Sequence, residues 1–258
     1  MIMKKESIIE LEKEWVELLK GPKRTNQQKI TKAPITAAEL DSQLQQDEEY
    51  QIWLKETEKL QSLLQSAYIE DARPLIDDLK KVGINIKSIW DLVNTKLSYK
   101  PAIPVLIEHL SKPYHLKNKE GIIRALAVKE AKGVACRAII DEYNKSPKTL
   151  STSYRWVFGN TMVVIITPEY VDDVIAIVSD KSNGISREMF VIALAKVKSE
   201  KTENLLISLL EDEDVVLSAL EALGMMKSKK AIDKILMLTN HSKNEVKKIA
   251  KKILKKLC

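Results

Sequence analysis

Glycine, aromatic residues and cysteine are all scarce in this chain. Its 258 residues include seven Gly, two Phe and two Cys, and aromatic residues make up 5% of the sequence. Low glycine and proline, with abundant Leu, Ile, Ala, Lys and Glu, favours helix throughout. The β-branched run at residues 162–166 is the one strand-like stretch. Because it lies inside a helical pattern, we expect it to end a buried helix.

The two cysteines, Cys136 and Cys258, cannot build a disulfide framework, which is typical of a reducing compartment. Cys136 stands among apolar residues, which predicts a place in the core rather than a nucleophile. No uninterrupted apolar run reaches the roughly 18 residues of a membrane span, and the N-terminus has no signal-peptide pattern. We therefore expect a soluble, cytoplasmic protein.

Residues that carry catalysis or bind metals form no recognisable constellation. The three histidines, His109, His115 and His241, fall in or beside different predicted helices and lack metal-ligand spacing. A phosphate-binding loop and a glycine-rich nucleotide fingerprint are also missing. The acidic run at residues 211–214 fits the start of a helix, where the dipole favours negative charge. The sequence thus predicts no enzyme activity, no cofactor and no metal site.

Positive charge is modest overall but concentrated at one end. The formal net charge is +6, and a basic balance suits either nucleic acid or an acidic protein partner. From Lys227 onward there are eleven lysines against only Asp233 and Glu245. The excess of positive charge is therefore uneven, and charge alone does not decide between the two kinds of partner.

The N-terminal third has helical patterns that differ from the rest. Residues 3–19 show apolar residues at helical spacing, and the polar stretch 23–34 predicts a linker. Thr36 with Glu39 forms a capping box that opens a long helix to about Ser66. The narrow apolar stripe of that helix predicts packing on the following repeats or, alternatively, dimerisation with a second chain.

Two short helices at residues 74–79 and 88–93 are predicted to cap the N-terminal end of a repeat region. We divide the chain into an N-terminal helix and linker at 1–35, a helical cap region at 36–98 and a repeat region at 99–258. The segments 123–127, 191–195 and 220–224 each close an apolar second helix, and self-similarity at roughly 30–35 residues indicates a solenoid. The predicted helix pairs are 102–111 with 117–129, 134–144 with 150–166, 169–179 with 184–197, 202–211 with 214–226, and 230–239 with 243–257.

These second helices resemble the HEAT-repeat family in its short bacterial form. That family has a Val-Arg pair, an Ala three residues later, and then Ala-Leu-Gly. Val216, Ala219 and residues 222–224 follow the pattern without the Arg, whereas Phe158 replaces the small residue in the second pair. The resemblance implies an all-α, right-handed α-α superhelix with extra N-terminal helices. It also implies a concave side formed by the second helices, and it says little about activity.

A basic ladder occupies equivalent positions of four second helices and is interrupted by Val216. A row of cations suits phosphates or acidic side chains. In the family, however, the equivalent Arg often bonds an acidic residue near the inter-helix turn, and Asp180 and Asp212 occupy such places here. The sequence leaves both interpretations open for the ladder residues Lys119, Arg155, Arg187 and Lys247.

Two further features are candidate binding sites. Trp156 lies in an aromatic segment and suits either a binding hot spot or a bulky repeat interface. The last helix is basic and amphipathic, which suits an anionic partner or a soluble C-terminal cap. Its secondary basic patch consists of Lys248, Lys251, Lys252 and Lys255.

From these features we predict a non-catalytic scaffold or adaptor. A protein or peptide would bind on the concave face through Lys119, Arg155, Trp156, Arg187 and Lys247. The alternative is nucleic-acid binding with a role in the repair of alkylated DNA, an activity found in one HEAT-like family whose motifs cannot be matched here. The alternative requires the ladder and the lysine-rich helix to form one continuous positive groove.

Overall fold

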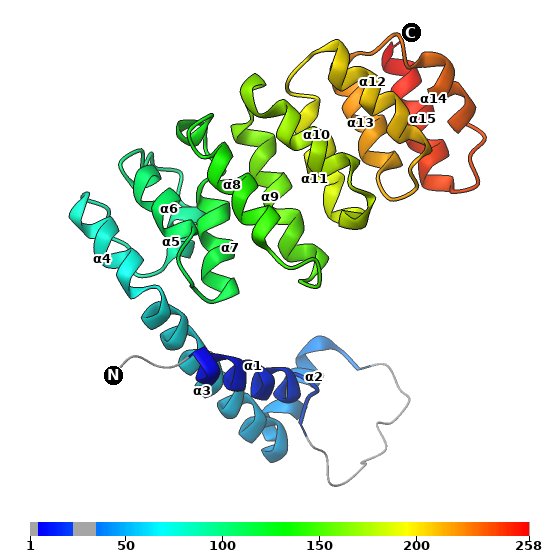
Figure 1. Cartoon of the computed structure of the whole chain (residues 1–258). Coiled ribbons are helices and arrows are strands. Elements are labelled where there is room, and N and C mark those ends of the chain that lie inside the picture. Colours follow the sequence, from blue (N-terminus) through cyan, green and yellow to red (C-terminus); the bar gives the residue numbers. More distant parts are fainter. Residues whose placement is uncertain (1–4, 23–34, 258) are drawn as a thin grey trace. The chain divides into compact units, whose positions relative to one another are not determined.

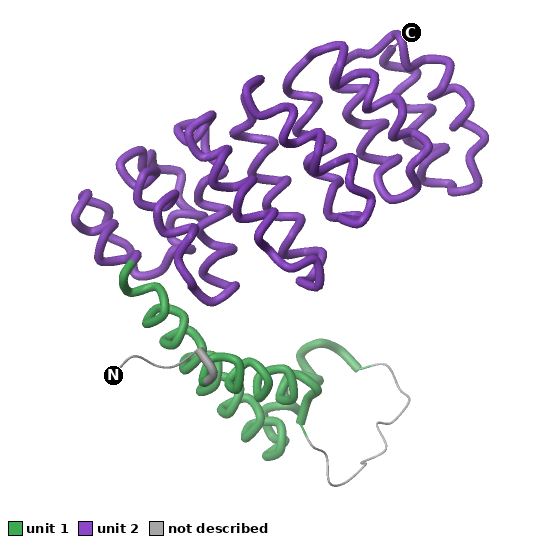
Figure 2. Tube along the Cα trace, in the orientation of Figure 1, with its two compact units in different colours: residues 1–74 green, residues 75–258 purple. Residues whose placement is uncertain are grey.

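The computed structural model describes residues 5–22 and 35–257, and every regular element in these ranges is helical (Figure 1). The predicted linker at 23–34 lies outside the described residues. The chain divides into two compact units, residues 1–74 and 75–258 (Figure 2). The sequence-based boundaries at residues 35 and 98 divide the chain into three parts rather than two, and that division stays a prediction.

The described residues of the first unit contain three whole helices. Helices α1 (Lys5–Leu18) and α2 (Ala37–Gln46) both contact α3 (Glu48–Asp71). The Trp53 indole N–H donates to the Leu18 carbonyl at 2.7 Å, and the Tyr68 hydroxyl donates to a Glu12 carboxylate oxygen at 2.6 Å. These two bonds tie α3 to α1 along its length.

The prediction of one continuous helix after Thr36 is wrong, because the helix is interrupted at Asp47. The capping box of Thr36 and Glu39 is confirmed at the start of α2. Asp47 then adopts an extended backbone, with φ −82° and ψ 105°, and its carboxylate accepts the Tyr50 amide at 3.0 Å. A second N-cap therefore starts a new helix at Glu48.

The second unit begins with the short helices α4 (Arg73–Lys81) and α5 (Ile89–Asn94), near the positions predicted for the cap. The buried His109 ties α4 to the first repeat. Its Nδ1 lies 2.6 Å from the Tyr114 hydroxyl, and its Nε2 lies 2.9 Å from Asp78 Oδ2. Hydrogen bonds from Lys81 first, and then from His109, lower the pKa of Asp78 to about 2.

Five helix pairs follow, and they match the predicted pairs closely. They are α6 (Ala102–Leu110) with α7 (Leu116–Ala125), α8 (Cys136–Lys145) with α9 (Thr152–Ile165), α10 (Val171–Ser179) with α11 (Glu188–Leu194), α12 (Glu200–Ser208) with α13 (Val216–Met226), and α14 (Ile232–Leu238) with α15 (Asn244–Leu257). Short 3-10 turns join several of them, including η3 (Lys181–Arg187) before α11. As expected, the run 162–166 ends a buried helix, α9.

The core runs along the second helices. Helices α5, α7, α9, α11, α13 and α15 contact one another in that order, and each first helix contacts its own second helix (Figure 1). Phe158 and Phe190 are fully buried between α9 and its neighbours, each edge-on to Tyr143. Packing limited to neighbouring pairs is the arrangement of an α-solenoid.

Close approach of two second helices depends on Gly159. A Cβ atom at this position would lie 2.8 Å from both Met189 Cβ and the Phe190 backbone nitrogen. Because real side chains do not approach so closely, α9 and α11 can meet this tightly only with glycine there. Cys136 is also buried, and burial raises the pKa of its thiol, so the predicted core position is confirmed. Cys258 lies outside the described residues.

Candidate partner-binding surface

Three ladder cations cap the first helix of their own pair. Each side chain donates to a backbone carbonyl nine residues earlier, at the end of the preceding first helix. The bonds are Lys119 Nζ to the Leu110 oxygen at 2.9 Å, Arg155 Nη1 to Ser146 at 2.8 Å, and Arg187 Nη1 to Val178 at 3.1 Å. Carbonyls at a helix end lack intrahelical partners, so a cation here satisfies an otherwise open acceptor.

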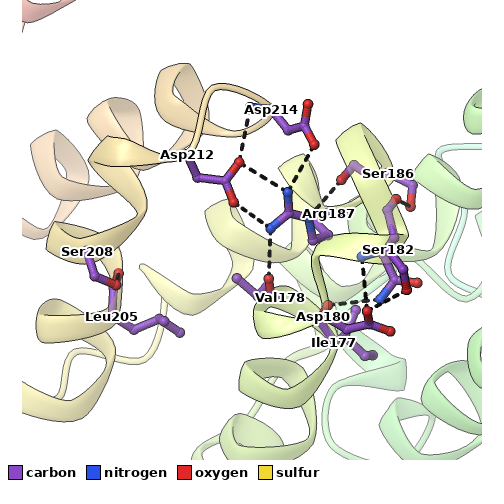
Figure 3. Close-up of polar contacts among 12 residues, drawn as sticks. Ile177, Val178, Asp180, Ser182, Ser186, Arg187, Leu205, Ser208, Asp212 and Asp214 are labelled. Atoms are coloured by element: carbon purple, nitrogen blue, oxygen red, sulfur yellow. Dashed lines mark hydrogen bonds and ion pairs between the residues drawn. The ribbon is translucent and has the colours of Figure 1, made fainter.

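The same cations also reach the next helix pair. Lys119 pairs with the Glu142 carboxylate of α8, and Arg155 Nη2 donates to Asn183 Oδ1 at 3.0 Å. Arg187 pairs with Asp212 at 2.9 Å and with Asp214 at 3.3 Å, both in the turn before α13 (Figure 3). Each of these three ladder cations therefore holds two successive repeats together.

Burial leaves these side chains little contact with solvent. Arg187 is 0% exposed and Arg155 is 3% exposed, and the Lys119 side chain is 12% exposed. The guanidinium of Arg155 also lies 4.1 Å from the centre of the Tyr143 ring. These three predicted contact residues are thus engaged within the chain. Lys247 is half-buried, and among the described residues its side chain has no hydrogen bond or ion pair.

The two acidic residues expected near the ladder behave differently. Burial raises the pKa of Asp212, but hydrogen bonds from Arg187 and from the Asp214 backbone outweigh it and the net shift is downward. Asp180 instead pairs with exposed Lys148 at 2.7 Å. Hydrogen bonds from Lys148 first, and then from Ser182, lower the pKa of Asp180 to about 2. Of these two acidic residues, Asp212 forms an ion pair with a ladder cation, whereas Asp180 pairs with Lys148, which is not part of the ladder.

The residues one and five positions after the ladder lie on a common side of each second helix, because helical residues four apart share a face. We call this side the second-helix face. The first column holds Glu120, Trp156, Glu188, Leu217 and Lys248, and the second holds Arg124, Asn160, Ile192, Glu221 and Lys252. It corresponds to the side predicted to be concave.

Side chains of α9, α11 and α13 meet on this face. Half-buried Trp156 and the charge of Glu221 both act on the Glu188 carboxyl group. Burial is the main cause that raises the pKa of Glu188, the Trp156 bond opposes it, and Glu221 adds to it. The predicted contact residue Trp156 therefore lies near the Glu188 carboxyl group, which in turn lies near the charge of Glu221.

A groove of about 230 Å³ continues the second-helix face between α13 and α15. Met225, 41% exposed, is its most accessible apolar side chain among the residues described there. The groove is lined by Glu221, Gly224, Met225, Ile249, Lys252, Ile253 and Lys256. Glu221 thus connects the groove to the surface around Trp156.

The predicted basic patch of α15 separates into two stripes. Lys248, Lys252 and Lys256 follow one another at every fourth residue on the second-helix face, and all three are exposed. Lys251 and Lys255 are exposed too, but they occupy positions that point toward the next second helix in earlier pairs. The residues equivalent to Lys251 are buried there, and they are Ile123, Gly159, Val191 and Leu220. A charged outer face of this kind is typical of a terminal repeat.

Comparison with known families supports the repeat architecture. The family described as HEAT repeats matches residues 171–255, which span the last three helix pairs. The match is confined to these residues, and the two preceding pairs continue the same all-α stack. Searches of curated proteins and of solved structures gave no match. Across the described residues, no helix is long and apolar enough to cross a membrane.

Proposed function

We propose that this chain is a non-catalytic scaffold that binds a protein or peptide partner on its second-helix face. HEAT repeats are typically protein-interaction scaffolds, and solenoids bind along extended surfaces. In this proposal Trp156 contacts the partner, Lys247 lies at the edge of the contact area, and Lys119, Arg155 and Arg187 support the surface from within.

The observation that carries the proposal is a contrast in charge pairing between the two sides of the stack. On the first-helix side, ion pairs link successive repeats, including Arg137 with Asp173 at 2.9 Å and Lys230 with Glu200 at 3.6 Å. On the second-helix face, the ion pair described is Glu120 with Arg124 at 2.8 Å, which lies within a single helix and links no repeats. Among the described residues, Glu188, Glu221 and the lysines 248, 252 and 256 form no ion pair. Charges left unpaired on one face are available to a partner.

Nucleic-acid binding, including repair of alkylated DNA, has weaker support. Three ladder cations are engaged within the chain, so they add little to a phosphate track. On the second-helix face, Glu188 and Glu221 lie between Arg124 and the lysines of α15, and their charge repels phosphates. A continuous positive groove, which this alternative requires, is therefore interrupted.

The proposal is tested by comparing two Asn→Arg variants of the full chain, purified with a tag from the native cells. Asn160→Arg places a bulky cation on the second-helix face, one helical turn from Trp156. Asn204→Arg makes the same change at an exposed position of α12, on the first-helix side. We expect one stoichiometric partner with the wild type and with Asn204→Arg, and loss of that partner with Asn160→Arg. Equal partner recovery with both variants would contradict the proposal.

A further inference from the structure

We propose that the groove between α13 and α15 binds an acidic segment of the partner, with carboxylates repeated about every fourth residue and an apolar side chain between them. This inference rests on the proposed function and specifies the chemistry of the partner at one end of the second-helix face.

The first support is the geometry of the lysine stripe. Lys248, Lys252 and Lys256 are four residues apart, so at 1.5 Å of rise per residue they recur every ~6 Å along α15. All three are exposed, and none forms an ion pair among the described residues. Carboxylates four residues apart on a helical peptide lying along α15 have the same ~6 Å spacing, so each would meet one ammonium group.

The second support is the apolar floor of the groove. Met225 is 41% exposed and Ile253 is 5% exposed, and both line the groove with half-buried Ile249. The groove volume of about 230 Å³ is smaller than the roughly 300–1,000 Å³ of small-molecule pockets. It suits an apolar side chain of a peptide, and the flexible thioether of Met225 can adapt to the shape of that side chain.

The third support is the presence of carboxylates beside the groove lysines. Glu221 stands on the α13 wall of the groove, opposite Lys252 and Lys256, and Glu188 follows on α11. A nucleic acid running along the face would bring its phosphates against both carboxylates. A peptide can instead present a backbone N–H or a basic side chain to Glu221 while its acidic residues pair with α15. Peptide chemistry therefore fits both walls of the groove.

The α15 helix offers a matched pair of variants for the test. Lys252→Glu/Lys256→Glu reverses two charges in the groove, whereas Lys251→Glu/Lys255→Glu reverses two charges on the outer stripe of the same helix. The probe is a fluorescent synthetic peptide with Glu at every fourth residue and Leu between, and its binding to the full chain is followed by anisotropy. We expect the groove variant to bind at least about tenfold more weakly and the outer variant within about twofold of wild type.

Several results would overturn the inference. One is no binding of the peptide, and another is an equal loss in the two variants. A third is tighter binding of a single-stranded oligonucleotide, or of phosphatidylserine vesicles, that depends on the same groove lysines. If the peptide fails while partner recovery still depends on Asn160, only this inference falls, because Asn160 does not line the groove. If recovery is independent of Asn160 while the peptide binds, the proposed function fails instead.

Discussion

A single ladder residue can bond both to the end of its own first helix and to the following helix pair. Arg187 closes the end of α10 through the Val178 carbonyl and reaches Asp212 of the following pair. A buried cation with this many partners is held in one geometry, which fixes the spacing of two repeats. A cation recurs at this position along the sequence because it contributes to packing between repeats, in addition to any role in binding.

Removing the Arg187 guanidinium should destabilise the chain strongly. Arg187→Met leaves the Asp212 carboxylate and a helix-end carbonyl without their partner, and breaking a buried pair in this way costs about 3–5 kcal/mol. Urea unfolding of the full chain measures this loss. Arg137→Met, which removes an ion pair from a side chain 52% exposed, should change the free energy of unfolding by less than about 1 kcal/mol. An equal loss in the free energy of unfolding for the two variants would show that the Arg187 ion pair does not stabilise the packing of the repeats more than a surface pair does.

Asp78 should contribute to the pH dependence of stability in acid. Its pKa falls from the ordinary 3.8 to about 2, so the folded state binds this proton less readily than the unfolded state does. The stabilisation is therefore complete above about pH 4 and is lost as the pH falls toward about 2. Asp78→Asn should flatten the curve of unfolding midpoint against pH in this window. Asp233→Asn, on exposed α14, should leave the curve as steep as in the wild type.

At the scale of elements, two glycines of second helices allow a direct comparison. At Gly159 a new Cβ meets the Phe190 backbone nitrogen at 2.8 Å, whereas at Gly224 it meets the Ile253 Cδ1 at 2.6 Å. A backbone atom cannot move aside as the end of a side chain can. Gly159→Ala should therefore cost about 1–3 kcal/mol. For Gly224→Ala, a small rotation of Ile253 and a gain in helix propensity should keep the change under about 1 kcal/mol. Thermal unfolding of both variants decides this, and the reverse order would contradict the proposed packing.

The sequence predicted most helices but not all of their ends. Apolar residues at helical spacing identified the five pairs because each pair buries a continuous stripe. The break at Asp47 was missed because the neighbouring Gln and Glu residues also suit a helix interior, and only the cap bond to Tyr50 shows the break. Local composition therefore detects an element more readily than a change of direction inside it.

The candidate surface was predicted only in part. Trp156 was recognised from its rarity, but Glu188 and Glu221 belong to no motif and look like ordinary solvated charges. Glu188 lies near both Trp156 and Glu221, which belong to two other helices, and a single sequence does not show this proximity. Counting one and five residues from the ladder would have found them, because the repeats keep a common register.

At the scale of the whole molecule, the two units differ in how much they bury. Among the described residues of the first unit, the buried apolar side chains are Ile8, Leu60, Leu64, Ala67 and Ala72. The second unit has a continuous core from Leu75 to Ile253. Since local stability follows buried apolar contact, amide hydrogens of α1 and α3 should exchange well before those of α9, α11 and α13. Hydrogen exchange with mass spectrometry measures this, and equal protection in both units would contradict the prediction.

Site-specific photo-crosslinking in the native cells determines whether the partner lies on the second-helix face. A photoreactive residue replaces Asn160 or Met225 on that face, and in matched controls Asn204 or Leu236 on first helices. We expect adducts to one common partner when position 160 or 225 carries the photoreactive residue, and none when position 204 or 236 carries it. Adducts that arise only from the first-helix positions would contradict it.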